Sequence, residues 1–260
     1  MIPVRTKYDP HCTKKMKSLD LINNLLKLIQ NIFDPNGTYW NSNGDMAMSV
    51  FCDGNKKKYN FILDSISLLE DVQLAKANYM KYGLSGPTKY ENYGECYLRL
   101  YGIYNACYLE KEAIFKLYEI LNLLASKKEI EKLEIFKFRK IFASHTINYG
   151  YKDKIQSFML TRMTLPQNRV SGNSMNGENN CDIVDGDLDI QLNEWNLKSA
   201  DLLVDYCHVI IEKLRKNAKI KMKYFDTIMK RIEEEKTGKV NYVDIWATHK
   251  AFKLVTIEDQ

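Results

Sequence analysis

The sequence predicts a mainly α-helical fold that carries a small β-containing insertion. Apolar residues recur at spacings of three and four along most of the chain, which is typical of amphipathic helices. Between about residues 155 and 193 the pattern changes to alternation, which is typical of strands. Proline and glycine interrupt the helical stretches and divide them into separate helices.

The first helix is expected over residues 18–33. Its apolar side chains follow one another at spacings of four, three and four, as Leu21, Leu25, Leu28 and Ile32. The turn residues at 34–37, which include a proline and a glycine, should end it. Residues 38–52 mix aromatic residues with Asn, Ser, Gly and Asp, and they fit a short hairpin or an irregular cover equally well.

Three further helices are expected over residues 59–82, 90–125 and 128–147, because each stretch keeps an apolar stripe. The second of them is rich in tyrosine: Tyr90, Tyr93, Tyr97, Tyr101, Tyr104, Tyr108 and Tyr118. These rings either pack half-buried, with their hydroxyls reaching solvent, or form a surface on which bases stack. The sequence leaves both interpretations open.

The insertion over residues 155–193 is expected to contain two extended segments. Residues 159–165 alternate in polarity and end at Pro166, and residues 182–192 alternate around Asp185-Gly186. An Asp-Gly dipeptide is a strong signal for a tight turn, so we expect a turn there.

The last helix is expected over roughly residues 197–235. It becomes basic between Lys213 and Arg231 and is followed by Gly238. We therefore expect three parts in the chain: an N-terminal helical or irregular extension over 1–58, a helical domain over 59–238 that carries the insertion, and a tail over 239–260 that packs on this domain.

Composition places the chain among ordinary globular proteins. Of its 260 residues, 45% are hydrophobic and 27% are charged, and the net charge of +5 is too small to establish a nucleic-acid partner by itself. The six cysteines form no C-x-x-C pair, the first ten residues lack the apolar core of a signal peptide, and no apolar run could span a bilayer. We expect a cytoplasmic protein with reduced thiols and no membrane partner.

No metal or cofactor is expected. The segment 83–89 lacks the spacing of a phosphate-binding loop, and the segment from Asp185 has Ile190 where a calcium loop needs glycine. The adjacent pairs His11-Cys12 and Cys207-His208 have no matching partners of the kind that hold zinc.

One short motif carries the functional prediction. Arg139 and His145 stand six residues apart in the segment 138–149, at the end of an apolar helix and between two long helices. An arginine followed by a histidine at this distance often arises by chance, so the context counts for more than the spacing.

The segment from Phe136 to Tyr149 resembles the R-x(4-6)-H motif that members of the HEPN superfamily carry on the third helix of a four-helix bundle. The segments Tyr97–Asn105 and Glu110–Ile114 also resemble the second core helix of that group. The resemblance covers roughly residues 60–235. It implies a HEPN-like four-helix bundle, to which this chain adds an N-terminal helix and the insertion.

The resemblance further implies a metal-independent endoribonuclease of the bacterial toxin or phage-defence type. In such proteins the equivalent of Arg139 contacts the scissile phosphate, the equivalent of His145 transfers protons, and both subunits of a homodimer usually contribute to one cleft. RNA, a second copy and, for a toxin, a neutralising protein are then the expected partners. Many catalytic members carry Asn, Asp or His directly after the arginine, whereas this chain has Lys140. A non-catalytic RNA- or protein-binding module therefore remains the alternative.

Geometry leaves the assembly of the motif open. Six helical residues advance about 9 Å and rotate by roughly 120°, so one straight helix does not bring both side chains to one point. Either the helix ends near Ala143-Ser144, or two copies form the site. In the alternative, Arg139 pairs with Glu131 or Glu134, and His145 interacts with a helix C-terminus.

Further RNA contacts are expected from polar and basic residues near the motif and on the last helix: Lys140, Asn148, Tyr149, Lys216, Lys219 and Lys223. Together with Lys56, Lys57 and Lys58, the basic part of the last helix would follow a phosphate backbone. A solvated helix face explains the same run of charge without RNA.

Overall fold

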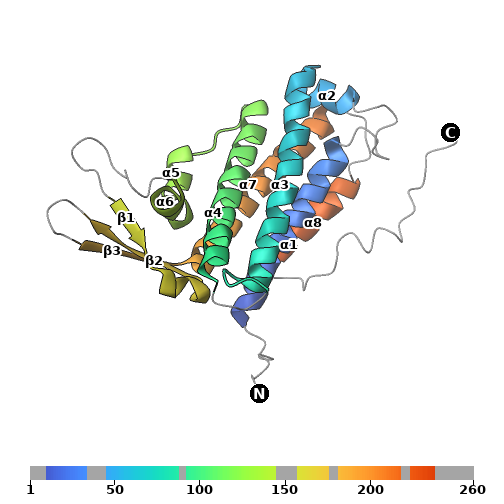
Figure 1. The fold of residues 1–260 in the computed structure, drawn as a ribbon. Helices are drawn as coiled ribbons and strands as arrows, with labels where there is room; N and C mark the ends of the chain where they lie inside the picture. The colour runs from blue at the N-terminus through green and yellow to red at the C-terminus, as the bar shows by residue number, and fades with distance from the viewer. Residues whose placement is uncertain are drawn as a thin grey trace, which may run out of the picture.

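The computed structural model confirms a mainly α-helical fold with a small antiparallel sheet (Figure 1). None of the described helices is both long and apolar enough to cross a membrane. The residues that the structure describes are 10–33, 45–87, 92–144, 157–175, 181–217 and 223–237.

Four long helices make the core of the molecule: α1 (Pro10–Phe33), α3 (Lys56–Tyr82), α4 (Tyr93–Ile120) and α7 (Leu188–Asn217). Helices α3 and α4 pack against each other, α4 contacts α7, and α1 contacts both α3 and α7. One continuous apolar core includes residues of all four helices. The first helix therefore belongs to the same core as the three other long helices.

Local signals determine where α3 and α4 begin and end. The Asn55 side chain accepts a hydrogen bond from the Lys58 amide, and Asn92 accepts one from Glu95, so each asparagine satisfies a free amide of a first turn. Gly83 ends α3 with a φ of 64°, a conformation that favours glycine. The predicted helices over 59–82 and 90–125 are confirmed with small shifts of their ends.

The structure contains a short helix, α2 (Asp45–Cys52), where we expected a hairpin or an irregular cover over residues 38–52. Its apolar residues Ala47, Phe51 and Cys52 lie on one helical face and are buried, and the Phe51 ring lies 4.8 Å from that of Phe33. Burial of this face stabilises the helix. The sequence pattern did not indicate it, because polar residues stand on either side of the short apolar stretch. Residues 38–44 lie outside the described residues.

The expected single helix over residues 128–147 is wrong. The chain forms α5 (Lys127–Glu131), α6 (Glu134–Arg139) and a π-helical turn, η1 (Lys140–Ser144), with Leu133 extended between α5 and α6. The apolar residues here pack against two different elements. The Phe136 ring packs edge-on against Trp195 of α7, with ring centres 4.9 Å apart, whereas the Phe142 ring packs against Phe158 of the sheet, with ring centres 6.2 Å apart. The change from α6 to the π-helical turn η1 lies between these two phenylalanines, so that one segment contacts both neighbours. Residues 145–147 lie outside the described residues.

The insertion forms a three-stranded antiparallel sheet in the order β1 (Ser157–Leu160), β2 (Arg169–Met175) and β3 (Cys181–Asp187). This confirms the extended character of the segment. The first strand stops earlier than expected, because a 3-10 helix, η2 (Arg162–Gln167), follows it and contains Pro166. Proline has no amide hydrogen for a strand ladder, which favours this ending.

Asp185 and Gly186 do not form the expected tight turn. They lie inside β3, where Asp185 pairs with Ser171 and Gly186 with Val170. Gly186 has no positive φ, and a Cβ atom there would lie 2.6 Å from Cζ of Phe138 and 2.4 Å from Nε2 of Gln191. The glycine permits close packing of α6 on the sheet, which the dipeptide signal does not reveal.

We expect Gly186→Ala to lower the free energy of unfolding by about 1–3 kcal/mol, the usual effect of overpacking a core. The Phe138 ring is buried and must move for the added methyl group. Asn173→Ala, an exposed position on the neighbouring strand, is the matched control and should change little. Urea unfolding monitored by circular dichroism measures both, and equal stability of the two variants would contradict the packing role.

The strand β3 passes directly into α7, so the insertion ends at Asp187 and not at 193. The Asp187 carboxylate accepts hydrogen bonds from the amides of Asp189 (2.8 Å) and Ile190 (3.1 Å) and thereby caps the helix. The helix consequently begins at Leu188, nine residues before the expected start.

The expected continuous helix over 197–235 is also wrong. Described residues after α7 resume in α8 (Lys223–Lys236), and Nε2 of His208 lies 3.2 Å from Oε1 of Glu233. Twenty-five residues of unbroken helix would separate these two by about 37 Å, so the chain must reverse. Helix α8 buries Ile228, Met229 and Ile232 and contacts α1. The tail over 239–260 lies outside the described residues.

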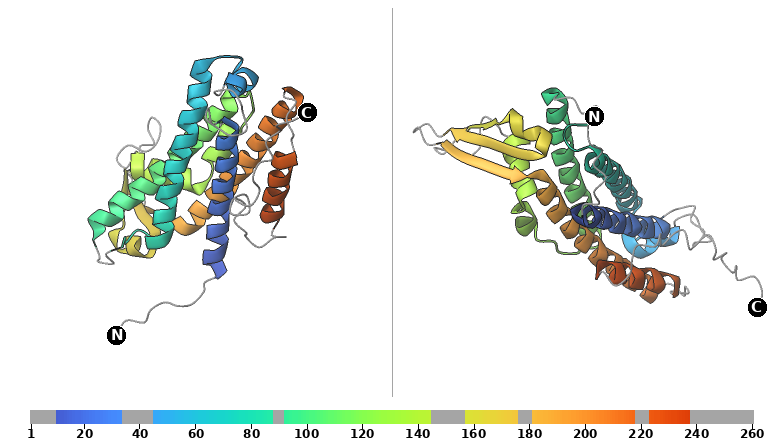
Figure 2. Two further views of the ribbon diagram at one scale, coloured as in Figure 1. Left: turned by 90° about the vertical axis from the view of Figure 1, so that its right-hand side faces the viewer. Right: turned by 90° about the horizontal axis from the view of Figure 1, so that it is seen from below.

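The sheet and α8 lie on opposite sides of the long helices (Figure 2). Helices α5 and α6 lie beside α4, on the side of the sheet (Figure 1). The segment that contains Arg139 is thus placed between α4 and the sheet, and it contacts α4, α7 and β1 through α6 and η1.

A fully buried polar cluster connects three of the long helices, and we call it the Glu110 network. The Glu110 carboxylate forms an ion pair with Lys76 and accepts hydrogen bonds from the Trp195 indole and from Nε2 of Gln73 (2.9 Å). The ammonium of Lys76 also donates to Oδ1 of Asn196 at 2.7 Å. Because its partners come from α3 and α7, this network determines which face α4 turns outward.

Candidate functional site

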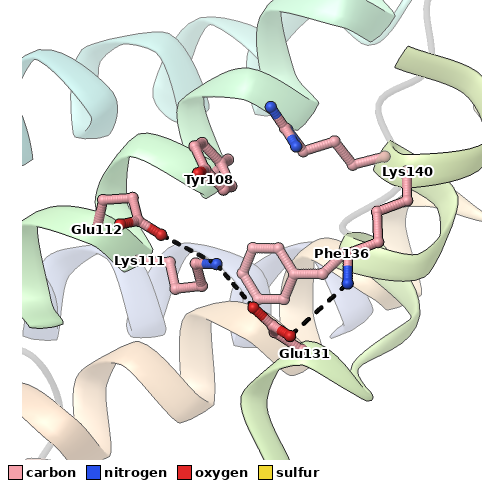
Figure 3. Close-up of a pocket in the computed structure, with 7 residues that line it drawn as sticks. Tyr108, Lys111, Glu112, Glu131, Phe136 and Lys140 are labelled. Atoms are coloured by element: carbon pink, nitrogen blue, oxygen red, sulfur yellow. Dashed lines mark ion pairs between the residues drawn. The ribbon is translucent and has the colours of Figure 1, made fainter. Parts of the chain in front are cut away.

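A pocket of about 260 Å³ opens between α4 and the α5–α6 segment. Helix α4 supplies one wall, and residues from α5, α6 and η1 supply the other (Figure 3). Its lining combines aromatic rings with charges of both signs: Tyr108, Lys111, Glu112, Glu131, Phe136, Arg139 and Lys140.

Arg139, the last residue of α6, is held from two sides. Its guanidinium carbon lies 3.8 Å from the centre of the Tyr108 ring, and its Nε donates a hydrogen bond to Oδ1 of Asn105 at 3.3 Å. Neither Glu131 nor Glu134 pairs with it, contrary to the structural alternative derived from the sequence. Within the described part of the chain, its terminal Nη atoms have no hydrogen-bond acceptor.

Lys111 forms the floor of the pocket and is only 4% exposed. Its ammonium lies 4.6 Å from the ring centre of Tyr108 and 5.4 Å from that of Phe136, so cation–π attraction offsets part of its desolvation. It is also 3.1 Å from Oε1 of Glu112 and 3.6 Å from Oε1 of Glu131.

Glu131 links this floor to the rim, because its other oxygen lies 3.7 Å from the ammonium of Lys140. Figure 3 shows the resulting sequence of contacts, Glu112–Lys111–Glu131–Lys140, which we call the ion-pair chain. The pocket therefore holds three cationic side chains and two carboxylates, and its charge balance is positive.

Of the residues predicted for the site, the structure brings Arg139 and Lys140 to the same pocket. Lys216 lies exposed in the last turn of α7 and does not line the pocket, and Lys223 is the first residue of α8. His145, Asn148, Tyr149 and Lys219 lie outside the described residues, and their predicted roles stay predictions.

Sequence reasoning did not find Lys111 and Glu112 as pocket residues, and it considered Tyr108 only as one of many tyrosines. Asn105, Tyr108, Lys111 and Glu112 follow one another at helical spacing and so share one face of α4. That spacing is a usable signal, but nothing local indicates that α6 covers this face.

The tyrosines of α4 divide between core and surface. Tyr104 and Tyr118 are buried, whereas Tyr97 and Tyr108 are half-buried. Tyr97 and Tyr101 form an aromatic pair with ring centres 5.9 Å apart. Most of these rings therefore pack, and Tyr108 alone among them lines the pocket.

The four cysteines whose side chains the structure describes give no sign of an activated thiol nucleophile. Burial raises the pKa of Cys107 to about 12, and it raises the pKa values of Cys52, Cys96 and Cys207 as well. A nucleophilic cysteine needs a lowered pKa to form the thiolate. Among the residues that the structure describes, no three His, Cys, Asp or Glu side chains are placed to hold a metal ion.

Comparisons of this chain with models of protein families, with curated proteins and with solved structures found no match.

Proposed function

We propose that the chain is a metal-independent endoribonuclease of the HEPN type, whose centre combines Arg139 with His145. The observation that carries the proposal is the state of Arg139. Tyr108 and Asn105 hold its guanidinium beside a positively charged pocket, while its Nη edge has no acceptor among the described residues. A guanidinium held in this way is suited to grip two oxygens of a phosphate.

The chemistry needs no metal. The RNA 2′-hydroxyl loses its proton and attacks the adjacent phosphorus, the bond from phosphorus to the 5′-oxygen breaks, and this oxygen takes up a proton. A histidine with a pKa near 6.5 exchanges protons at neutral pH. Arg139 stays cationic and stabilises the charge on the phosphorane.

The backbone around Arg139 favours a functional role. The regular helix ends at Arg139, and a π-helical turn occupies Lys140–Ser144. Such turns are rare and occur frequently at functional sites. They also change the direction of the side chains that follow, so the geometry of one straight α-helix does not apply between Arg139 and His145.

A second copy of the chain is the partner that we propose for α4. Leu98, Tyr101, Gly102, Asn105 and Leu109 form an exposed and uncharged stripe, which we call the α4 face. In an antiparallel pairing about its midpoint, Leu98 lies opposite Leu109 of the second copy, and Gly102 lies opposite Asn105. Since Asn105 holds Arg139, this pairing brings two arginines close to one axis.

We expect the wild type to be a dimer in solution and Leu98→Glu together with Leu109→Glu to give a monomer with reduced RNA cleavage. The two leucines are 74% and 42% exposed, so the charges should not disturb the monomer. Leu124→Glu, at a fully exposed position beyond α4, is the control and should stay dimeric. Light scattering measures the mass. A monomeric wild type at micromolar concentration with intact cleavage would contradict the dimer.

The endoribonuclease is tested by incubating the purified chain with mixed RNAs in excess chelator. We expect cleavage that the chelator leaves unchanged, since the proposed mechanism uses side chains only. Cleavage that requires an added divalent ion would overturn the proposed mechanism.

A non-catalytic binding module is the second candidate, and the α4 face favours it. An exposed apolar stripe fits a partner protein as well as a second copy. Arg139 and Lys140 then stabilise the α6 segment and no more. RNA that binds without being cleaved, or no RNA binding at all, would support this candidate.

A further inference from the structure

Glu131 is a poor partner for the cations that surround it. Its oxygens lie 3.6 Å from the ammonium of Lys111 and 3.7 Å from that of Lys140, and both distances exceed a good charge-assisted hydrogen bond. The Glu131 side chain is 44% exposed, so water screens both contacts. This carboxylate is therefore held weakly.

Lys111, in contrast, is held firmly in the site by its surroundings. It is nine-tenths buried or more, and Tyr108, Phe115 and Phe136 surround its ammonium. A lysine in such surroundings gains from a closely placed anion, because a buried charge is poorly screened. Together with Lys140 and Arg139 it presents three cations around the small space that Glu131 now shares.

We propose that the Glu131 carboxylate occupies the place of an RNA phosphate in the free protein, and that bound RNA displaces it. The phosphate then lies between Lys111 and Lys140, next to the phosphate that Arg139 contacts. This inference rests on the proposed function for the identity of the ligand, because it assigns a second phosphate of the same RNA to the pocket. It does not depend on cleavage.

The size of the pocket agrees with a phosphate group. Its volume of about 260 Å³ is below the roughly 300–1,000 Å³ of pockets for drug-sized ligands. A phosphate with part of its ribose suits such a space, which the half-buried Tyr108 ring also lines. The ammonium groups of Lys111 and Lys140 face different oxygens of the Glu131 carboxylate. A phosphodiester likewise has two non-bridging oxygens, one for each ammonium group.

The test compares Glu131→Gln with Glu129→Gln in the full chain. Both glutamates belong to α5, but Glu129 pairs with Lys132 at the surface and does not line the pocket. The probe is a fluorescent single-stranded oligodeoxynucleotide, which lacks the 2′-hydroxyl and is not cleaved. We expect Glu131→Gln to bind it about fivefold more tightly at low salt, because a weakly held counter-ion is removed. Equal or weaker binding relative to Glu129→Gln would overturn the inference.

Lys140→Gln provides an independent measurement, because its half-exposed side chain is not needed for folding. Loss of one phosphate contact should reduce the slope of log affinity against log salt by about 0.7. An unchanged slope would overturn the inference. Inorganic phosphate and adenosine monophosphate serve as competitors: displacement of the oligonucleotide by either one at equal phosphate concentration would assign the pocket to a free phosphate and not to RNA.

Failure of the two proposals can be told apart. If RNA is not cleaved while Glu131→Gln still strengthens oligonucleotide binding, the phosphate site stands and the endoribonuclease falls. If RNA is cleaved while Glu131→Gln behaves like Glu129→Gln, the endoribonuclease stands and Glu131 is only a surface ion-pair partner.

Discussion

Arg139→Ala and His145→Ala should each reduce the rate of RNA cleavage by about 10²–10⁴-fold, the usual effect of removing a positioned acid–base or phosphate-binding group. The free energy of unfolding should change little, because Arg139 lies at the rim of a pocket and its contacts are one aromatic stack and one hydrogen bond. Arg139→Lys should not restore the rate, since an ammonium cannot bind two phosphate oxygens with a planar fork.

The matched controls are Arg169→Ala and His208→Ala. Arg169 pairs with Asp185 on the sheet, and His208 pairs with Glu233 on α8, so both are surface residues away from the pocket. Each should cleave RNA at the rate of wild type. If His145→Ala cleaves as well as these controls, or if it melts the protein, the histidine is structural and the binding module becomes the better account.

Glu110→Ala should lower the free energy of unfolding by about 3–5 kcal/mol, the usual effect of removing one partner from a buried ion pair. The change leaves the ammonium of Lys76 without a counter-ion in a fully buried position, and it also removes the acceptor of the Trp195 indole. Denaturant unfolding measures the change in midpoint at constant slope.

Two variants make this prediction specific. Glu119→Ala, on the exposed side of the same helix, removes only a surface pair with Lys116 and should change stability by less than about 1 kcal/mol. The double variant Lys76→Met with Glu110→Leu should lose less stability than Glu110→Ala alone, because no buried charge remains unpaired. A double variant that is less stable than the single one would contradict this account of the network.

Three of the four long helices, α1, α3 and α4, were predictable because their signals are local. An apolar stripe defined α1, and in α3 and α4 the capping residues Asn55, Gly83 and Asn92 stand beside such stripes in the sequence. The alternation from residue 182 likewise indicated β3, whereas only Met159 and Leu160 of the alternating segment 159–165 belong to a strand and residues 162–165 belong to η2. Where the prediction is confirmed, the residues that determine the element lie within it or directly beside it.

The secondary-structure predictions were wrong where contacts between residues distant in sequence determine the structure. The segment 128–147 contains enough apolar residues for a helix, but Phe136 packs on Trp195 and Phe142 on Phe158, and the regular helix changes to the π-helical turn η1 between them. Gly186 follows an aspartate as in a turn, yet its lack of a side chain leaves room for the Phe138 ring. The local sequence pattern does not indicate these packing contacts.

The candidate site was predictable only in part for the same reason. The motif identified Arg139 and Lys140, which the structure places in one pocket. Lys111 and Glu131 remained hidden as a pair, because they come from α4 and α5 and meet only through the packing of α6 on α4. Motifs find residues that are close in sequence, whereas a pocket also needs those that the fold brings together.

The chemistry of the new RNA ends, with excess chelator present, tests the central claim most directly. Attack by the neighbouring 2′-hydroxyl leaves a 2′,3′-cyclic phosphate on one product and a 5′-hydroxyl on the other, and mass spectrometry distinguishes both from linear ends. We predict these ends for the wild type and their absence for His145→Ala under the same conditions. Products with a 3′-hydroxyl and a 5′-phosphate, or intact RNA with the wild type, would contradict the account.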